Sequence, residues 1–235
     1  MNDSINTGFN RKLAGMVDHT LLKPDATAEQ IANLCREAED FQFKSVCINP
    51  FWVPLASQIL KNTPVVVGTV IGFPLGAIPT VSKIREAWEA VDHGATEIDM
   101  VINIGALKSG QMETTGSDIK DVVKAISGGA SVKVILETCY LTQEEKISGC
   151  KLAVEAGAHF VKTSTGFGPA GASVEDVALF RRTVGPDVGV KASGGIRDYE
   201  TALAMIRVGA NRIGTSAGIK IVTQSANPDS QNGEY

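Results

Sequence analysis

The 235-residue sequence has no excess of basic residues. Its 22 Lys and Arg are outnumbered by 26 Asp and Glu, which gives a formal net charge of -4. A protein that binds nucleic acid or an anionic membrane surface needs basic residues to meet the phosphate groups. We therefore expect no nucleic-acid partner and no membrane partner, and any anionic ligand must be bound by local contacts.

Long apolar runs and paired cysteines are missing as well. No run approaches the roughly 20 apolar residues that span a bilayer, and the polar start MNDSINTGFNRK lacks the apolar stretch of a signal peptide. Four cysteines occur without CxxC or CxxH spacing, so we expect free thiols in a reducing compartment. They are Cys35, Cys47, Cys139 and Cys150. These features predict a cytoplasmic location.

Four Gly-Ala pairs divide the chain into repeating units. Each pair follows a helical pattern and precedes a β-rich run, where glycine suits the left-handed turn after a helix. The pairs are Gly94-Ala95, Gly129-Ala130, Gly157-Ala158 and Gly209-Ala210. Thr27 with Gln30, and Thr142 with Glu145, have the spacing of a capping box and predict helix starts.

The helical segments repeat apolar residues at the helical period. One such set is Ile84, Ala87, Trp88 and Val91. This spacing predicts that the set, Trp88 included, faces the protein core.

Eight β-rich segments alternate with helix-length segments. They cover 16–22, 44–50, 65–73, 97–103, 132–138, 160–166, 188–195 and 211–217. Units of about 25 to 30 residues with this order predict an α/β fold with a parallel sheet, and eight of them fit a single-domain (β/α)₈ TIM barrel over residues 1–235. The alternative is an open doubly wound sheet, but no GxGxxG follows the first strand. Residues 1–10 and about 223–235 are expected to be loose termini.

One parity of the strand residues carries charged and polar side chains, although buried parallel strands are expected to be apolar on both faces. Successive side chains point to opposite faces, so this parity would point into the barrel. Its members are Asp18, Cys47, Asp99, Glu137, Lys162 and Lys191. Because isolated buried charges are costly, we expect them to pair around a functional cavity. Glu97 and Lys133 are expected to form a structural ion pair.

Lys162 and Lys191 lie at matching depths of consecutive strands, in VKTSTG and VKASGG. Neighbouring parallel strands are roughly 5 Å apart, so the two amines would be neighbours. Burial and a second ammonium group both lower the pKa of a lysine, which is the arrangement that produces a free nucleophilic amine near neutral pH.

Glycine-rich loops follow the last three strands. They are Gly166–Gly171, Gly194–Ile196 and Gly214–Ser216. Phosphate sites of such barrels are often built after strands seven and eight from backbone N–H groups. The loops therefore predict a phosphorylated ligand.

The residues that carry these patterns resemble the deoxyribose-phosphate aldolase family. The resemblance extends from about residue 11 to 218. The matching strings are VDHTLL (17–22), VCINP (46–50), EIDMVIN (97–103), KVILET (133–138), VKTSTGFG (161–168), VKASGGIR (190–197) and RIGTSAG (212–218).

This resemblance implies a class I aldolase that reversibly cleaves 2-deoxy-D-ribose 5-phosphate into acetaldehyde and D-glyceraldehyde 3-phosphate. It implies no metal and no organic cofactor, and a homo-oligomer, either dimer or tetramer. Lys162 matches the Schiff-base lysine, Lys191 the lysine that lowers its pKa, and Asp99 the acid that transfers protons. The residues expected at the substrate are Asp18, Thr20, Cys47, Thr163, Gly166, Gly194, Gly195, Gly214 and Ser216.

Three positions depart from the family pattern. Phe167 stands where some members carry a lysine that reaches the phosphate, and Ala217 stands where some have a second serine. Both changes concern phosphate affinity. Some members end in a tyrosine that enters the site, and Tyr235 also ends this chain, in a different tail.

Two other functions fit the residues. A sugar-phosphate isomerase or epimerase would use Glu137 or Asp99 as its base and would need no covalent adduct. A non-catalytic phosphosugar-binding barrel would hold Lys162 protonated and show no turnover. Borohydride trapping of an adduct on Lys162 distinguishes the aldolase from both.

Overall fold

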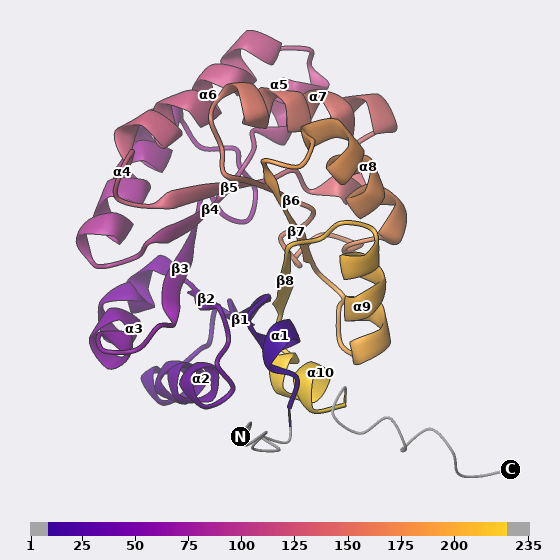
Figure 1. The fold of residues 1–235 in the computed structure, drawn as a ribbon. Helices are drawn as coiled ribbons and strands as arrows, with labels where there is room; N and C mark the ends of the chain where they lie inside the picture. The colour runs from indigo at the N-terminus through magenta and orange to yellow at the C-terminus, as the bar shows by residue number, and fades with distance from the viewer. Residues whose placement is uncertain (1–8, 225–235) are drawn as a thin grey trace, which may run out of the picture.

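The computed structural model describes residues 9–224, and its centre is a closed barrel of eight parallel strands paired in chain order. The predicted (β/α)₈ fold is confirmed. Figure 1 shows the strands in the middle with the helices around them. The strands are β1 (Val17–Leu21), β2 (Ser45–Ile48), β3 (Val66–Ile71), β4 (Glu97–Val101), β5 (Ser131–Ile135), β6 (Phe160–Lys162), β7 (Gly189–Ser193) and β8 (Arg212–Thr215). Every predicted strand is present but shorter than expected, because the flanking residues belong to loops or, at Pro50 and Thr138, begin short 3₁₀ helices.

Ten α-helices and two short 3₁₀ helices lie within the described residues. They are α1 (Arg11–Ala14), α2 (Ala28–Asp40), η1 (Pro50–Trp52), α3 (Val53–Leu60), α4 (Thr80–Asp92), α5 (Ile104–Lys108), α6 (Met112–Ala125), η2 (Thr138–Tyr140), α7 (Gln143–Glu155), α8 (Val174–Val184), α9 (Tyr199–Arg207) and α10 (Gly218–Gln224). Residues 223 and 224 thus end a helix. Asn10 caps α1 and the ring of Phe9 packs edge-on against Phe41, so the prediction of loose ends is wrong for these residues too. Residues 1–8 and 225–235, Tyr235 among them, lie outside the described residues.

The predicted helix boundaries follow from local chemistry. Both capping boxes are present: the Thr27 side chain accepts from Gln30 N and the Thr142 side chain accepts from Glu145 N. Three of the four Gly-Ala turns have a glycine at positive φ. At the fourth pair, Gly128 (φ 81°) takes the left-handed conformation instead of Gly129, because α6 ends earlier and a longer turn leads into β5.

The alternation of the strands places apolar side chains against the helices. Ile98 and Met100 of β4 and Val134 of β5 are completely buried in the main hydrophobic cluster. The opposite parity points inward, and the parallel register aligns inward residues of neighbouring strands. Asp99 is opposite Lys133, and Lys162 is opposite Lys191.

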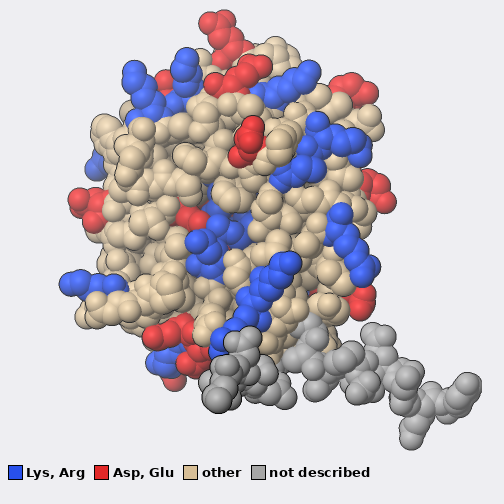
Figure 2. Space-filling model, viewed as in Figure 1, with Lys and Arg blue, Asp and Glu red and all other residues tan. Residues whose placement is uncertain are grey.

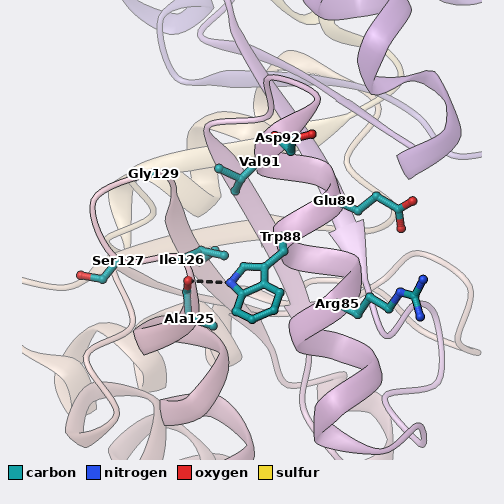
Figure 3. A pocket seen from close by; sticks show the side chains of 9 residues that line it. All are labelled: Arg85, Trp88, Glu89, Val91, Asp92, Ala125, Ile126, Ser127 and Gly129. Carbon is teal, nitrogen blue, oxygen red and sulfur yellow. Dashed lines mark hydrogen bonds between the residues drawn. The ribbon is translucent and has the colours of Figure 1, made fainter.

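The core position predicted for Trp88 is wrong. Its side chain is 58% exposed, because α4 presents Ala87 and Lys83 to the barrel and turns the indole to the outside. Trp88 Nε1 donates to Ala125 O at 2.8 Å, across a surface groove between α4 and the end of α6 (Figure 3). Trp88 therefore has the spacing of the apolar residues of α4 but lies on the surface, against the end of α6.

Charges on the outside are mixed in sign. On the face drawn in Figure 2, basic and acidic side chains alternate around the rim, with Lys and Arg near the middle. None of the helices in residues 9–224 is long and apolar enough to cross a membrane. A separate group of charged side chains is buried inside the barrel.

Candidate active site

Seven charged side chains meet inside the barrel, and each is at most 6% exposed. All come from inward positions of six strands, so the strand alternation alone brings them together. They are Asp18 of β1, Glu97 and Asp99 of β4, Lys133 of β5, Lys162 of β6, Lys191 of β7 and Arg212 of β8. The sequence analysis placed all of these inside except Arg212, on which it was silent.

Asp99 lies at the centre of this network. Its Oδ2 is 2.7 Å from Lys162 Nζ and also 2.7 Å from Lys191 Nζ, while its Oδ1 is 2.8 Å from Lys133 Nζ. The two lysines predicted to cooperate therefore share one carboxylate oxygen. Their nitrogens are neighbours on the same side of the sheet, buried away from bulk water.

The remaining ion pairs of the network join its basic groups to Asp18 and Glu97. Lys191 is 2.5 Å from Asp18, and Arg212 contacts both Asp18 at 2.6 Å and Glu97 at 2.9 Å. The expected Lys133–Glu97 pair is present at 2.7 Å. Arg212 could have been found from the alternation of β8, since it shares its parity with Gly214.

The balance of charge in this network distinguishes Lys162 from the other basic groups. Four basic groups face three carboxylates, so one basic group has no carboxylate of its own. Lys191, Lys133 and Arg212 each contact at least two carboxylates, whereas Lys162 contacts Asp99 alone among the carboxylates of residues 9–224. Burial disfavours the charged form of a group most strongly where the group lacks its own counter-ion.

The pKa directions agree with this balance. Burial lowers the pKa of Lys162, Asp99 opposes that change, and the positive charge of Lys191 lowers the pKa further, so that it lies below the ordinary value. For Lys191, burial is outweighed by Asp18 and Asp99, which hold its pKa above the ordinary value. Although burial acts to raise the pKa of Asp99, its three lysine neighbours hold it well below the ordinary value. The site combines a lysine whose pKa is lowered, a lysine whose pKa is raised and a carboxylate whose pKa is lowered.

A cleft of about 360 Å³ opens above Lys162 and contains most of the expected substrate-binding residues. Lys162 is in its wall, and Asp99 and Lys191 lie beneath. The expected residues that line it are Thr20, Gly166, Gly194, Gly195, Gly214 and Ser216. The mutual position of these residues fits a ligand that reaches from the amine to the glycine-rich loops.

Three expected residues lie outside the lining of this cleft. Asp18 is in the network below, and Cys47 Sγ is 3.9 Å from Asp99 Oδ2, where burial raises the pKa of the thiol. The Thr163 hydroxyl donates to Ser193 O and accepts from Ser193 N, both at 3.1 Å. Thr163 thus joins β6 to β7. Direct contact of these three residues with substrate stays a prediction.

The glycines of the loops have defined geometric roles. Gly166, Gly194 and Gly195 have positive φ of 81–88°, which favours glycine. A Cβ at Gly214 would lie 3.0 Å from Lys191 Cε, so this glycine also makes room for the second lysine.

Two basic side chains of the cleft were missed by the sequence analysis. Lys23 and Arg197 line it and are exposed. A signal was available, because Lys23 follows DHTLL and Arg197 follows GGI. Phe167 lines the same cleft and is edge-on to Phe73, with ring centroids 5.3 Å apart. The cleft therefore has the aromatic ring of Phe167 where some family members carry a lysine, and its positive charge comes from Lys23 and Arg197.

The inward position predicted for Glu137 is wrong. β5 ends at Ile135, so the alternation stops before Glu137, which has left-handed backbone angles of φ 56° and ψ 67°. Its carboxylate accepts from Thr165 N and does not contact the central network. Glu137 is also absent from the lining of the cleft, which it approaches through Thr165.

Comparison with known proteins gives a consistent result over nearly the whole chain. Residues 12–224 match the DeoC/LacD family aldolase model. A protein of Brevibacillus brevis named deoxyribose-phosphate aldolase is 61% identical over 207 residues, covering 88% of this chain and 93% of the relative. One of Halalkalibacterium halodurans with the same name is 58% identical over 228 residues, covering 97% and 100%.

Solved structures of similar proteins have the same fold. A putative deoxyribose-phosphate aldolase of Coccidioides immitis has a TM-score of 0.89 at 44% identity, covering 92% of this chain and 86% of the other. A deoxyribose phosphate aldolase of Aeropyrum pernix, described as having a unique tetrameric structure, has a TM-score of 0.85 at 37% identity, covering 93% and 92%.

Proposed function

The chain belongs to the DeoC/LacD family of aldolases, and from this premise we propose that it reversibly cleaves 2-deoxy-D-ribose 5-phosphate into acetaldehyde and D-glyceraldehyde 3-phosphate through a Schiff base on Lys162. The observation that carries the residue assignment is the charge balance of the barrel. Lys162 is the basic group with a single carboxylate neighbour, and it is the member of the network that lines the cleft.

The first step needs the free amine. Lys162 Nζ attacks C1 of the open-chain aldehyde, and loss of water from the carbinolamine leaves a protonated imine. Lys191 remains an ammonium group because Asp18 and Asp99 both neutralise it. It thus keeps Lys162 neutral without competing with it as a nucleophile.

The imine then accepts the electrons of the breaking bond. The C3 hydroxyl gives up its proton, C3 becomes the carbonyl of glyceraldehyde 3-phosphate, and the C2–C3 electron pair forms an enamine with the imine. Protonation at C2 and hydrolysis release acetaldehyde and the free lysine. Asp99 and Lys191 lie beneath the amine and would exchange these protons, help that is typically worth about 10²–10⁴-fold.

The phosphate would be bound at the other end of the cleft. Gly166, Gly194, Gly195 and Ser216 offer backbone and hydroxyl donors, and Arg197 adds positive charge. Phe167 supplies no charge, so the phosphate depends on these donors.

Borohydride trapping tests the proposal. Incubation with 2-deoxyribose 5-phosphate and borohydride, followed by peptide mapping, should add one reduced adduct to the peptide with Lys162, and Lys162→Met should abolish it. Turnover without an adduct would support an isomerase. Binding without turnover or adduct would support a non-catalytic phosphosugar-binding protein.

The quaternary structure and location are also proposed from the relatives. We propose a homo-oligomer, dimer or tetramer, because the Aeropyrum pernix relative is described as tetrameric. Light scattering coupled to size-exclusion chromatography measures the mass, and a monomer at micromolar concentration would contradict this. A cytoplasmic location is proposed because the four cysteines are free and the substrate is a phosphorylated sugar.

A further inference from the structure

Glu137 is a buried carboxylate next to the active site for which the reaction described above has no role. The residue is 2% exposed. Its backbone angles lie in the left-handed region, which residues other than glycine rarely adopt. Gly168 packs against it so closely that a Cβ there would lie 3.3 Å from Glu137 Cδ. Both the backbone and the neighbouring loop are shaped around this carboxylate.

The hydrogen bonds of Glu137 lead to one residue. Both carboxylate oxygens accept from Thr165 N at 3.3 Å, and Oε2 also accepts from the Thr165 hydroxyl. Within residues 9–224, the one other hydrogen-bond donor to this carboxylate is the weak Cys139 thiol, 3.8 Å from Oε1. The left-handed turn after β5 thus directs the carboxylate to the loop that leaves β6, three residues beyond Lys162.

The hydrogen bonds continue from Thr165 into the glycine-rich loop. Thr165 Oγ1 accepts from Phe167 N at 3.0 Å, so the backbone N–H groups on both sides of Gly166 are occupied. Gly166, at φ 88°, lines the cleft, and its own N–H has no hydrogen-bond partner among residues 9–224. Glu137 and Thr165 therefore leave one free backbone donor at the turn.

A second turn on the other side of the cleft has the same construction. Thr215 Oγ1 donates to Ile196 O at 2.7 Å and accepts from Ala217 N at 2.9 Å, and Ser216 lies between them in the cleft wall. This turn is anchored by a backbone carbonyl. The turn at Gly166 is held by the side chain of Glu137. Of the two turns, it is therefore the one whose acceptor can be removed by a substitution.

We propose that Glu137 is a positioning residue for phosphate recognition, which holds Thr165 so that the N–H of Gly166 is presented to the substrate phosphate. The inference rests on the proposed function of the cleft. A carboxylate suits the task because it accepts from the Thr165 N–H and hydroxyl together. A glutamine offers one acceptor oxygen instead of two, and its amide NH₂ replaces an oxygen that accepts from Thr165 N, so the substitution weakens the contact with Thr165.

The test compares substrates with and without the phosphate. For Glu137→Gln, KM for 2-deoxyribose 5-phosphate should rise at least about tenfold, the effect of losing one aligned hydrogen bond to a charged group. KM and kcat for unphosphorylated 2-deoxyribose should change less than about twofold, because Lys162 is untouched. Thr165→Val should reproduce the change, Thr165→Ser should not, and the two losses should not add in the double variant.

A matched control separates positioning from general stability. Asp118 is a buried carboxylate that pairs with Lys83 at 2.5 Å, outside the cleft. Asp118→Asn should lower the thermal midpoint without changing the ratio of the two KM values. Equal losses for both substrates in Glu137→Gln, or an unchanged ratio, would overturn the inference.

Trapping of acetaldehyde on Lys162 with borohydride keeps the two proposals distinct. If the unaltered protein forms no adduct, the proposed function fails. If every variant forms the adduct at the same rate and the KM ratio is constant, only the role of Glu137 fails.

Discussion

Replacing Lys191 with methionine is expected to slow Schiff-base formation on Lys162 at pH 7 by about 10²–10³-fold. The reason is the charge balance of the barrel. Without Lys191, three basic groups face the three carboxylates, and the balance is reached only when Lys162 holds its proton. The substituted protein therefore has a charged, non-nucleophilic Lys162.

The magnitude follows from the geometry of the pair. Both nitrogens are 2.7 Å from the same Asp99 oxygen, and two unit charges about 4 Å apart interact by about 4 kcal/mol at an effective dielectric of 20. A factor of ten in the protonation equilibrium corresponds to about 1.4 kcal/mol, so the full interaction is worth up to about 10³-fold. Rearrangement around the vacated position reduces this towards 10².

The assay is the rate of borohydride-trapped acetaldehyde adduct on Lys162, measured from pH 6 to pH 10. Since the free amine is the reactive form, the rate of Lys191→Met should recover as the pH rises, and Lys191→Arg should retain more activity at pH 7 because it retains the charge. Adduct formation by Lys191→Met at the original rate at pH 7 would refute the electrostatic explanation.

Three further predictions concern other parts of the site. Asp99→Asn should lower kcat for cleavage by about 10²–10⁴-fold in a coupled assay, because its proton-transfer group is lost; an unchanged kcat would exclude that role. Phe167→Lys should lower KM for 2-deoxyribose 5-phosphate by about tenfold, as expected for one added charge-assisted contact, with no change for 2-deoxyribose; an equal change in both would contradict a phosphate contact. The pKa of Asp99 lies below its ordinary value of 3.8 because burial is outweighed by three lysines, so its contribution to stability is present above pH 3.8 and is lost as the pH falls further. Urea unfolding should therefore be easier at pH 3 than at pH 5, and Asp99→Asn should weaken this dependence.

The inward lysines and carboxylates were predictable because a strand has a fixed two-residue period. Lys162, Lys191 and Asp99 needed only their parity and the assumption of a closed barrel. Arg212 belongs to the same pattern, yet a single arginine in a four-residue strand is a weak signal, and its partners Asp18 and Glu97 are more than 100 residues away.

Two predictions failed where that period did not apply. In the sequence, Glu137 continues the two-residue alternation of β5. In the structure, β5 ends at Ile135 and the backbone of Glu137 is left-handed. Trp88 has the helical period of a core residue, but the neighbouring helix end accepts its N–H and leaves the ring outside. A local turn decided the orientation of Glu137, and a neighbouring helix end, remote in sequence, decided that of Trp88.

The order of residues was by itself sufficient to determine the number of strands, the helix starts at Thr27 and Thr142, and the side of each strand that carries charge. These are local properties, because backbone periodicity and capping act within a few residues. Only the closed barrel decided that four basic groups would share three carboxylates, that Lys162 would be the one without its own, and that Glu137 would anchor the loop at Gly166. Such outcomes depend on distances between separate strands and loops, and those distances exist only after the chain has folded.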